Sequence, residues 1–99
     1  MYLIRDIMYC KPGKTREMVD KFKAMTDLMK STGSRPLRVL TDVSAERYWT
    51  VVAEMEVENL EEYIGEARST MNDEEMKKIM KGYHDLVESG RREIYMVER

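Results

Sequence analysis

The clearest pattern in the sequence is an alternation of apolar residues between Tyr48 and Val57, which reads YWTVVAEMEV. An alternation with a period of two predicts a β-strand. The other side of this strand is mixed and includes Glu54 and Glu56. Because both sides carry apolar residues, we expect the strand to lie in the middle of a sheet, with helices covering the wholly apolar side. That side is formed by Trp49, Val51, Ala53, Met55 and Val57.

A second segment, Tyr2 to Cys10, has the same character and reads YLIRDIMYC. It is apolar on both sides except for Arg5 on one face and Asp6 on the other. We therefore predict a second central strand. Pro12 and Gly13 follow it, and together they indicate a tight turn that ends the strand.

The first helix is predicted from about Lys14 to Lys30, where the apolar spacing changes to that of a helix. Ser31, Thr32 and Gly33 read as its end, since Gly33 is free to adopt a left-handed conformation. The stripe that should face the sheet consists of Met18, Val19, Phe22, Met25, Leu28 and Met29.

After Pro36, alternation resumes over Leu37 to Val43 and predicts a strand. Only about four polar residues, Ser44 to Arg47, separate it from the central strand described first. Two strands joined by so short a connection predict an antiparallel hairpin.

The remaining sequence predicts a broken helix and a final strand. Asn59 followed by Glu62 resembles a capping box, and Asn72 followed by Glu75 repeats the signal, so we expect a break near Asn72. The second part should run to about Val87 and end at Gly90. Residues 92–98 then predict the last strand. The expected inner stripes contain Leu60, Tyr63, Ile64, Ala67 and Met71, followed by Met76, Ile79, Met80, Tyr83, Leu86 and Val87.

The order strand, helix, strand, strand, helix, strand has few topological solutions. Right-handed crossovers and uncrossed connections predict an α+β, ferredoxin-like domain over residues 1–99. Its sheet would have four antiparallel strands with both helices on one face. The other face would still carry apolar side chains without a cover, so we expect a second copy of the chain to cover it in a homodimer.

Composition narrows the class of protein. The chain has 17 basic and 19 acidic side chains and a net charge of −2, with the two signs interleaved, so nothing favours nucleic acid or an anionic membrane as a partner. Its one cysteine, Cys10, has no partner for an internal disulfide and suits a reducing compartment. We therefore expect a soluble, cytoplasmic protein.

Two residues could carry acid–base chemistry. Asp6 lies in mid-strand on the face expected to meet the helices, where burial would favour a general base unless a cationic partner reaches it. His84 is the only histidine and lies at the edge of the apolar stripe. The alternative for each residue is a structural role: Asp6 would form an ion pair, and His84 would lie at the boundary of the core. The hypothesis is that they share a pocket for a small, apolar or aromatic molecule, lined by Trp49, Tyr63, Met80 and Tyr83.

A different cluster is expected on the opposite face. If Asp6 faces the helices, Arg5 faces the dimer interface together with Glu54 and Glu56. Neighbouring central strands would allow Arg5 to pair with one of these glutamates. Charges in such an interface would set its register more than its stability.

The sequence also resembles a known group of proteins. A chain of this order, with Pro12, Gly13 and Lys14 leading into the first helix and a break at Asn72 and Asp73, is similar to the dimeric α+β barrel superfamily. The nearest branches are the antibiotic-biosynthesis-monooxygenase-like and NIPSNAP-like proteins, and the resemblance covers essentially the whole chain. It implies a barrel of two sheets packed face to face, with a pocket between the sheet and helices of each protomer.

The resemblance also implies a range of activities. The most consistent is a cofactor-independent monooxygenase, or a related proton-transfer enzyme such as an isomerase, with Asp6 or His84 as base. The alternative is a non-catalytic ligand-binding or stress-response dimer. In the haem-degrading branch, an Asn, a Trp and a ligating His stand where this chain has Asp6, Tyr63 and Met80 or Gly82. With one His and one Cys, no transition-metal ligand set can be assembled, so we expect no metal and no cofactor.

Overall fold

The computed structural model describes residues 1–31, 33, 35 and 37–99. Its strands are β1 (Tyr2–Cys10), β2 (Arg38–Thr41), β3 (Thr50–Val57) and β4 (Val87–Met96). Its helices are α1 (Thr15–Ser31), α2 (Leu60–Met71), α3 (Glu74–Met80) and the short 3-10 helix η1 (Tyr83–Asp85). The strands form one antiparallel sheet in the order β2-β3-β1-β4, as the ferredoxin-like prediction requires.

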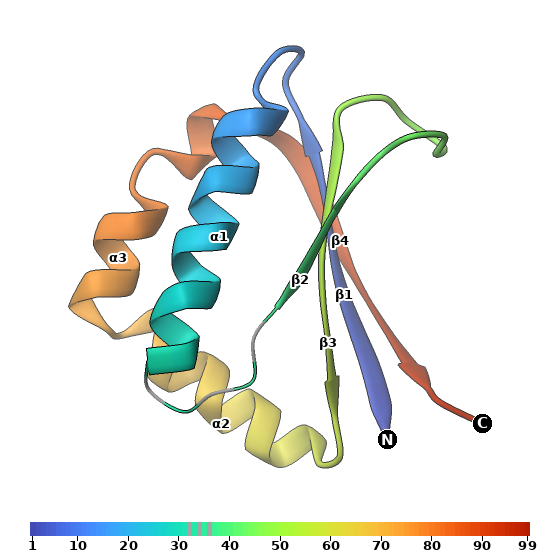
Figure 1. Cartoon of the computed structure of the whole chain (residues 1–99), viewed down its shortest axis with the longest axis vertical. Helices are drawn as coiled ribbons and strands as arrows, with labels where there is room; N and C mark the ends of the chain where they lie inside the picture. The colour runs from blue at the N-terminus through green and yellow to red at the C-terminus, as the bar shows by residue number, and fades with distance from the viewer. Residues whose placement is uncertain (32, 34, 36) are drawn as a thin grey trace.

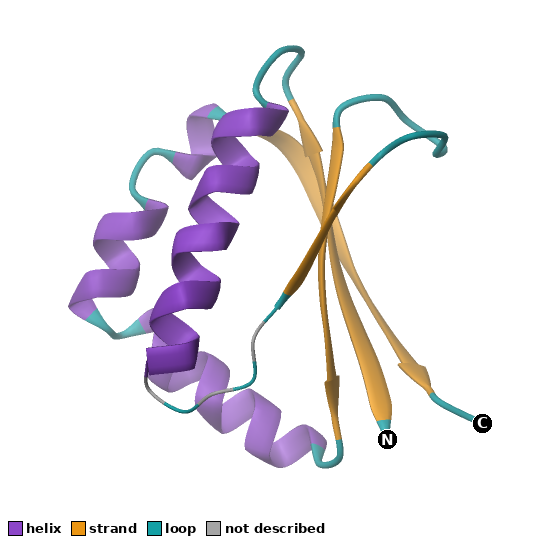
Figure 2. Ribbon diagram, in the orientation of Figure 1, coloured by secondary structure: helices purple, strands orange, loops and turns teal. Residues whose placement is uncertain are grey.

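The two strands that the sequence marks as central are central. β1 pairs with β3 on one side and with β4 on the other, so Ile4 stands opposite both Met55 and Ile94. Within the described chain, the helices lie on one side of this sheet and leave the other side open (Figure 2). We call that second side the open face. The alternation of side chains along β1 places Asp6 on the helix side and Arg5 on the open face.

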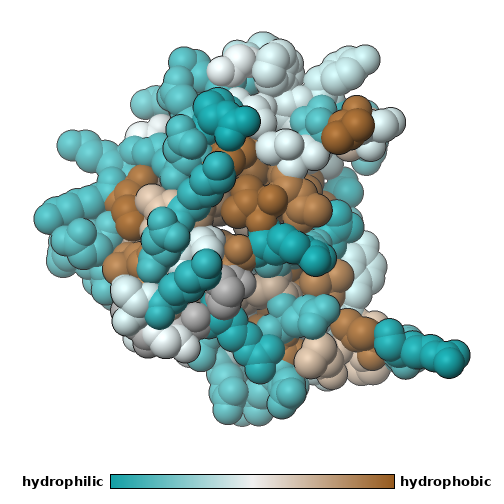
Figure 3. Space-filling model, viewed as in Figure 1, coloured by the Kyte–Doolittle hydropathy of each residue, from teal (hydrophilic) through white to brown (hydrophobic). Residues whose placement is uncertain are grey.

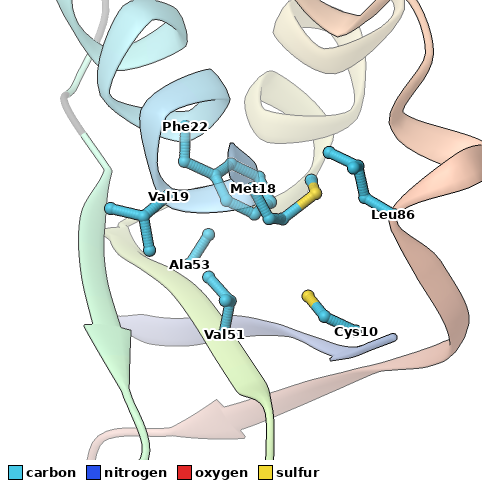
Figure 4. Close-up of a cluster of buried hydrophobic side chains, with 7 residues drawn as sticks. All are labelled: Cys10, Met18, Val19, Phe22, Val51, Ala53 and Leu86. Carbon is cyan, nitrogen blue, oxygen red and sulfur yellow. The ribbon is translucent and has the colours of Figure 1, made fainter. Parts of the chain in front are cut away.

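The main core lies between α1 and the middle of the sheet. Met18, Val19 and Phe22 of α1 are buried and point toward β3 (Figure 4). Burial of each such side chain contributes about 1.5–3 kcal/mol, so this layer fixes α1 on the sheet. Figure 3 shows hydrophobic side chains gathered between the helices and the strands, with hydrophilic ones outside. The sheet contributes Cys10, Val51 and Ala53 to this cluster, and Leu86, between η1 and β4, completes it.

The broken helix confirms one predicted cap and corrects the other cap and one predicted end. The Asn59 side chain accepts hydrogen bonds at the start of α2, as predicted. The second predicted cap, Asn72, instead ends α2, and the Asp73 side chain caps the start of α3. The predicted continuation to Val87 is wrong, because α3 ends at Met80. Gly82 adopts a left-handed conformation with φ of 83°, which ends the regular helix and leads into η1.

Several strand limits also differ from the prediction. β4 begins at Val87, so Gly90 lies inside a strand and does not end a helix. β3 begins at Thr50, because Trp49 has a positive φ of 60° and cannot continue the extended chain. β2 spans Arg38–Thr41, shorter than the predicted Leu37 to Val43. Gly33 does adopt the left-handed conformation, with φ of 80°. Two other predictions, Thr32 as part of the helix end and Pro36 as the residue before the next strand, fall outside the described residues.

The second helix packs less closely than its pattern predicts. Leu60 and Tyr63 pack on the smaller core cluster of Ile4, Met55 and Val57, as expected. Ile64 and Met71, however, are 48% and 73% exposed, although they belong to the predicted inner stripe. The break after Met71 turns the chain into α3, and it is Met76 of α3 that becomes buried.

Candidate functional site

An open cavity of about 390 Å³ lies between η1, the first half of β4 and the middle of β1. It exists because the regular helix stops early and the chain crosses to the sheet through η1. The residues that matter for its chemistry are Asp6, Met8, Tyr83, His84, Gly90 and Arg92.

Asp6 is held by an arginine from the neighbouring strand. Arg92 Nε donates a hydrogen bond to Asp6 Oδ1 at 2.6 Å, and the register places the two residues directly opposite each other. This hydrogen bond is the main cause that raises the pKa of Arg92 above its usual value. The carboxylate is therefore partnered, which is the structural alternative considered for Asp6. It gives the cavity a fixed, charged wall.

Tyr63 completes a small cluster around this pair. The Arg92 guanidinium lies 5.8 Å from the centroid of the Tyr63 ring, within the range of a cation–π interaction. Burial raises the pKa of Tyr63, the negative charge of Asp6 raises it further, and the positive charge of Arg92 opposes both effects. The phenol thus stays protonated and forms an apolar support behind the ion pair.

His84 lies on the exposed rim of the cavity. Its ring stacks on Tyr83, with centroids 4.0 Å apart and the planes inclined by 33°. Among the interactions of the described residues, no hydrogen bond or ion pair engages its two ring nitrogens. A neutral imidazole in this position can accept a proton from a bound molecule.

Backbone hydrogen bonds hold η1 in place. Leu86 N donates to Tyr83 O at 2.9 Å, and Lys11 N donates to Leu86 O at 2.8 Å, which ties η1 to the end of β1. On the other side, Lys21 Nζ of α1 donates to Ile79 O at 3.0 Å and to Lys81 O at 2.7 Å. This ammonium caps the carbonyl end of α3 just before the turn that presents His84.

Gly90 allows a close approach of strand and side chain in the cavity. A Cβ atom at this position would lie 2.8 Å from Met8 Sδ and 3.0 Å from Ile7 O. The Met8 thioether therefore occupies the space that any other residue at position 90 would fill. Met8 gives the cavity a flexible apolar floor.

The sequence-predicted site residues separate into two groups. Asp6, His84 and Tyr83 line one cavity, and Tyr63 lies beside it next to Arg92. Met80 instead packs against the main core cluster. Trp49 lies outside the cavity lining, 42% exposed in the connection between β2 and β3.

Arg92 and Gly90 are the functional residues that sequence reasoning missed. Gly90 was expected to end the last helix, because the apolar stripe was extended through Val87, and Arg92 was expected to begin the last strand. The sequence pattern does not give the register between β1 and β4, which places Arg92 opposite Asp6. Gly82 was the signal that could have indicated the earlier end of the helix, since glycine commonly ends a helix.

The second predicted cluster forms around Glu54 on the open face. Arg5 Nε lies 3.3 Å from Glu54 Oε2, which agrees with the expected pairing across the ladder. Arg38 of β2, which was not predicted, also binds Glu54. Glu54 is only 6% exposed beneath these two arginines, whereas Glu56 is exposed. The carboxylate of Glu54 is thus buried by its own partners.

Neither a metal-binding cluster nor a membrane-spanning helix occurs among the described residues. No group of three or more His, Cys, Asp and Glu side chains gathers there in a way that could hold a metal ion. Over the same residues, every helix is too short or too polar to cross a membrane.

Comparison with known proteins gives a consistent answer at the level of structure. No family model matches the sequence, and no curated protein is significantly similar to it. A NIPSNAP domain protein from Burkholderia xenovorans superposes with a TM-score of 0.80 at 14% identity, over 98% of this chain and 94% of that one. A NIPSNAP family protein from Agrobacterium tumefaciens gives 0.81 at 12% identity, over 96% and 90% of the chains.

A candidate antibiotic biosynthesis monooxygenase from Nitrosomonas europaea is also similar, with a TM-score of 0.73 at 14% identity over the whole of both chains. Structural similarity at such low sequence identity establishes a shared fold and leaves the activity open. The resemblance inferred from sequence is thereby confirmed for the fold: this chain has the α+β, ferredoxin-like architecture of NIPSNAP family and antibiotic-biosynthesis-monooxygenase-like proteins.

Proposed function

We propose that the protein binds a small, flat, partly apolar molecule in the cavity between η1, β4 and β1. The observation that carries the proposal is that Asp6, which lies far from Tyr83 and His84 in the sequence, lines the same open cavity as these two residues. Cavities that combine apolar walls with a few convergent polar groups are the usual form of ligand sites.

The lining suggests how such a molecule would be held. The Tyr83 and His84 rings offer a surface on which an aromatic ring can stack, and Met8 can adjust to its shape. The Arg92 guanidinium uses Nε for Asp6, so its terminal nitrogens can donate to an oxygen substituent of the ligand. An aromatic ketone or phenol satisfies both requirements.

The enzymatic form of the proposal is a cofactor-independent oxygenase with His84 as base. Its ring nitrogens have no partner among the described residues, whereas Asp6 is already paired with Arg92. His84 would remove a proton from an activated CH₂ group, and the resulting carbanion would react with O₂. In the balanced reaction, R₂CH₂ + O₂ gives R₂C=O + H₂O, so one oxygen atom enters the product and the other leaves in water.

We also propose that the protein acts as a cytoplasmic homodimer that buries the open face. Leu40 and Tyr95 on that face are 37% and 49% exposed, and an arginine pair already shields Glu54 among them. A second sheet packed there would cover these side chains. The free thiol of Cys10 supports the assignment to a reducing compartment.

Anthrone provides a direct test, because it is flat and carries a CH₂ group between two aromatic rings. Binding would be followed by native mass spectrometry and turnover by oxygen consumption. We expect His84→Gln to lower turnover about 100-fold or more, as loss of a general base does. Lys23→Gln, on the exposed side of α1, serves as the control and should match the wild type.

The outcomes separate the two forms of the proposal. Turnover that depends on His84 supports the oxygenase. Binding of anthrone without oxygen consumption supports the non-catalytic ligand-binding alternative. If neither anthrone nor a co-purified small molecule binds, the cavity has no ligand function and the proposal fails.

A further inference from the structure

Lys21 belongs to α1, but its ammonium group binds the backbone at the end of a different helix. Lys21 Nζ donates to Ile79 O at 3.0 Å and to Lys81 O at 2.7 Å. α1 and α3 lie side by side in Figure 1, and the half-buried Lys21 side chain bridges them. Lys14, just before α1, instead forms an exposed ion pair with Glu17, which is only three residues away. Lys21 is therefore directed at the point where α3 ends.

The two carbonyl groups that Lys21 binds lie on either side of the place where the regular helix stops. Ile79 O is one of the last four carbonyls of α3, which have no amide donor within their own helix. Lys81 O lies beyond the helix, in the peptide group that joins Lys81 to Gly82. A cation at this end of a helix also interacts favourably with the helix dipole. One ammonium group thus binds both the end of α3 and the first peptide group after it.

The contact with Lys81 O restrains the direction in which the chain leaves α3. A peptide group is planar, so holding its oxygen restrains ψ of Lys81 and φ of Gly82 together. These angles are 128° and 83°. Glycine adopts positive and negative φ about equally readily, so Gly82 by itself does not select this geometry. A contact from outside the turn has to favour it, and the Lys21 ammonium group makes such a contact.

The direction of the chain at Gly82 determines where the next two side chains, Tyr83 and His84, lie. Both line the cavity, and they are the first two residues of the three-residue η1. At its other end, η1 leads into Leu86, which is 5% exposed in the core and whose carbonyl accepts from Lys11 N at 2.8 Å. His84 itself is exposed, so packing does not fix its ring. The ring pair therefore depends on how the two ends of η1 are held.

We infer that Lys21 is a positioning residue of this site: its ammonium group holds the turn at Gly82 and thereby places the rings of Tyr83 and His84. The inference rests on the proposed function for the use of that ring pair, and it extends the site to a residue of α1 that lies outside the cavity lining. Positioning requires a side chain that reaches across from α1 and carries at least two N–H donors. Lysine and arginine meet both conditions, whereas methionine has a similar reach and no donor.

His84 provides a direct probe, because it is the single histidine and its imidazole gives one set of NMR signals. Its ring lies 4.0 Å from that of Tyr83, centroid to centroid, so the signal senses the ring current of the tyrosine. In Lys21→Met we expect the His84 Cε1–H resonance to move toward the position of an unstacked imidazole. Lys21→Arg should keep the wild-type position. Lys23→Met, an exposed position on the same helix, is the matched control and should also keep it.

Hydrogen exchange separates positioning from a general loss of stability. Asp85 N donates to Gly82 O at 3.0 Å in this turn. Leu86 N donates to Tyr83 O at 2.9 Å. In Lys21→Met we expect these two amides to exchange about tenfold faster or more, while the amides paired between β1 and β3 keep their rates. Lys21→Arg should restore slow exchange in the turn.

Anthrone binding tests the consequence for the site. We expect Lys21→Met to raise the dissociation constant of anthrone about tenfold or more, because small displacements of aligned groups weaken a site strongly. Lys21→Arg and Lys23→Met should bind as the wild type does.

The outcomes distinguish this inference from the proposed function. A His84 resonance that does not move in Lys21→Met, or exchange that accelerates equally in the turn and in the sheet, overturns the inference and leaves the proposed function intact. Anthrone binding that is equal in Lys21→Met and the wild type also overturns it. Wild-type protein that does not bind anthrone overturns the proposed function, whereas the resonance shift and the local exchange in Lys21→Met would still support the placement of η1 by Lys21.

Discussion

Arg92 and Asp6 are 86 residues apart in the sequence, yet Arg92 Nε donates to Asp6 Oδ1 at 2.6 Å from the opposite position on the next strand. Their side chains are 54% and 30% exposed, so water screens much of their attraction. We therefore expect Asp6→Asn to lower the free energy of unfolding by only about 1 kcal/mol in thermal denaturation. A loss several times larger would contradict this view of the pair.

Burial is the main cause that raises the pKa of Tyr63, and the charges of Asp6 and Arg92 add smaller effects of opposite sign. Because Asp6 raises the pKa of Tyr63 and Arg92 lowers it, Asp6→Asn should lower that pKa and Arg92→Leu should raise it. NMR titration with ¹³C-labelled tyrosine measures both shifts directly. Shifts of the same sign in the two variants would show that the charges do not act on Tyr63 as the geometry indicates.

Glu54 depends on two arginines on the open face, and this predicts non-additive effects. Arg5→Leu leaves Arg38 bound to Glu54, so we expect a loss of about 1 kcal/mol in urea denaturation. Arg5→Leu combined with Arg38→Leu leaves a carboxylate that is 7% exposed without a partner, and the loss should exceed the sum of the single variants. Additive losses would mean that Glu54 does not require either arginine.

Gly90→Ala should reshape the cavity. The added Cβ would meet Met8 Sδ at 2.8 Å, so Met8 must move, and we expect a loss of stability of about 1–3 kcal/mol with weaker anthrone binding. Met8→Ala in the same chain should restore part of the lost binding. Gly65→Ala is the control, because its Cβ meets nothing within 4 Å on α2. Equal stability of the Gly90 and Gly65 variants would contradict the close approach.

Cys10 predicts a specific loss of stability in alkali. Burial raises the pKa of the Cys10 thiol above its ordinary value of 9.0, with the charge of Asp42 adding to the effect. Above pH 9 the unfolded chain therefore loses this proton before the folded protein does, and the free energy of unfolding falls as pH rises through the folded pKa. The stability advantage of the wild type over Cys10→Ala should be largest near pH 7 and shrink above pH 9 in denaturant titrations. A stability advantage of the wild type that grows with pH would contradict the predicted effect of the raised Cys10 pKa.

The amino-acid sequence by itself determined the elements and their order. Alternation along residues 2–10 and 50–57 identified the two central strands, because a strand buried on both faces must be apolar on both. Asn59 and the helix break near Asn72 were readable because capping is a local interaction within a few residues. With the order of elements known, handedness and short connections left one sheet topology.

Only the tertiary structure decided which side chains meet. The pairing of Asp6 with Arg92, the second arginine on Glu54 and the exclusion of Trp49 from the cavity all depend on where each strand begins. A change of one residue in strand register moves every side chain to the other face, so small errors at a strand end change the whole site. The local pattern of apolar and polar residues determines which side chains are suited to burial. The register between distant strands determines which side chains lie next to one another.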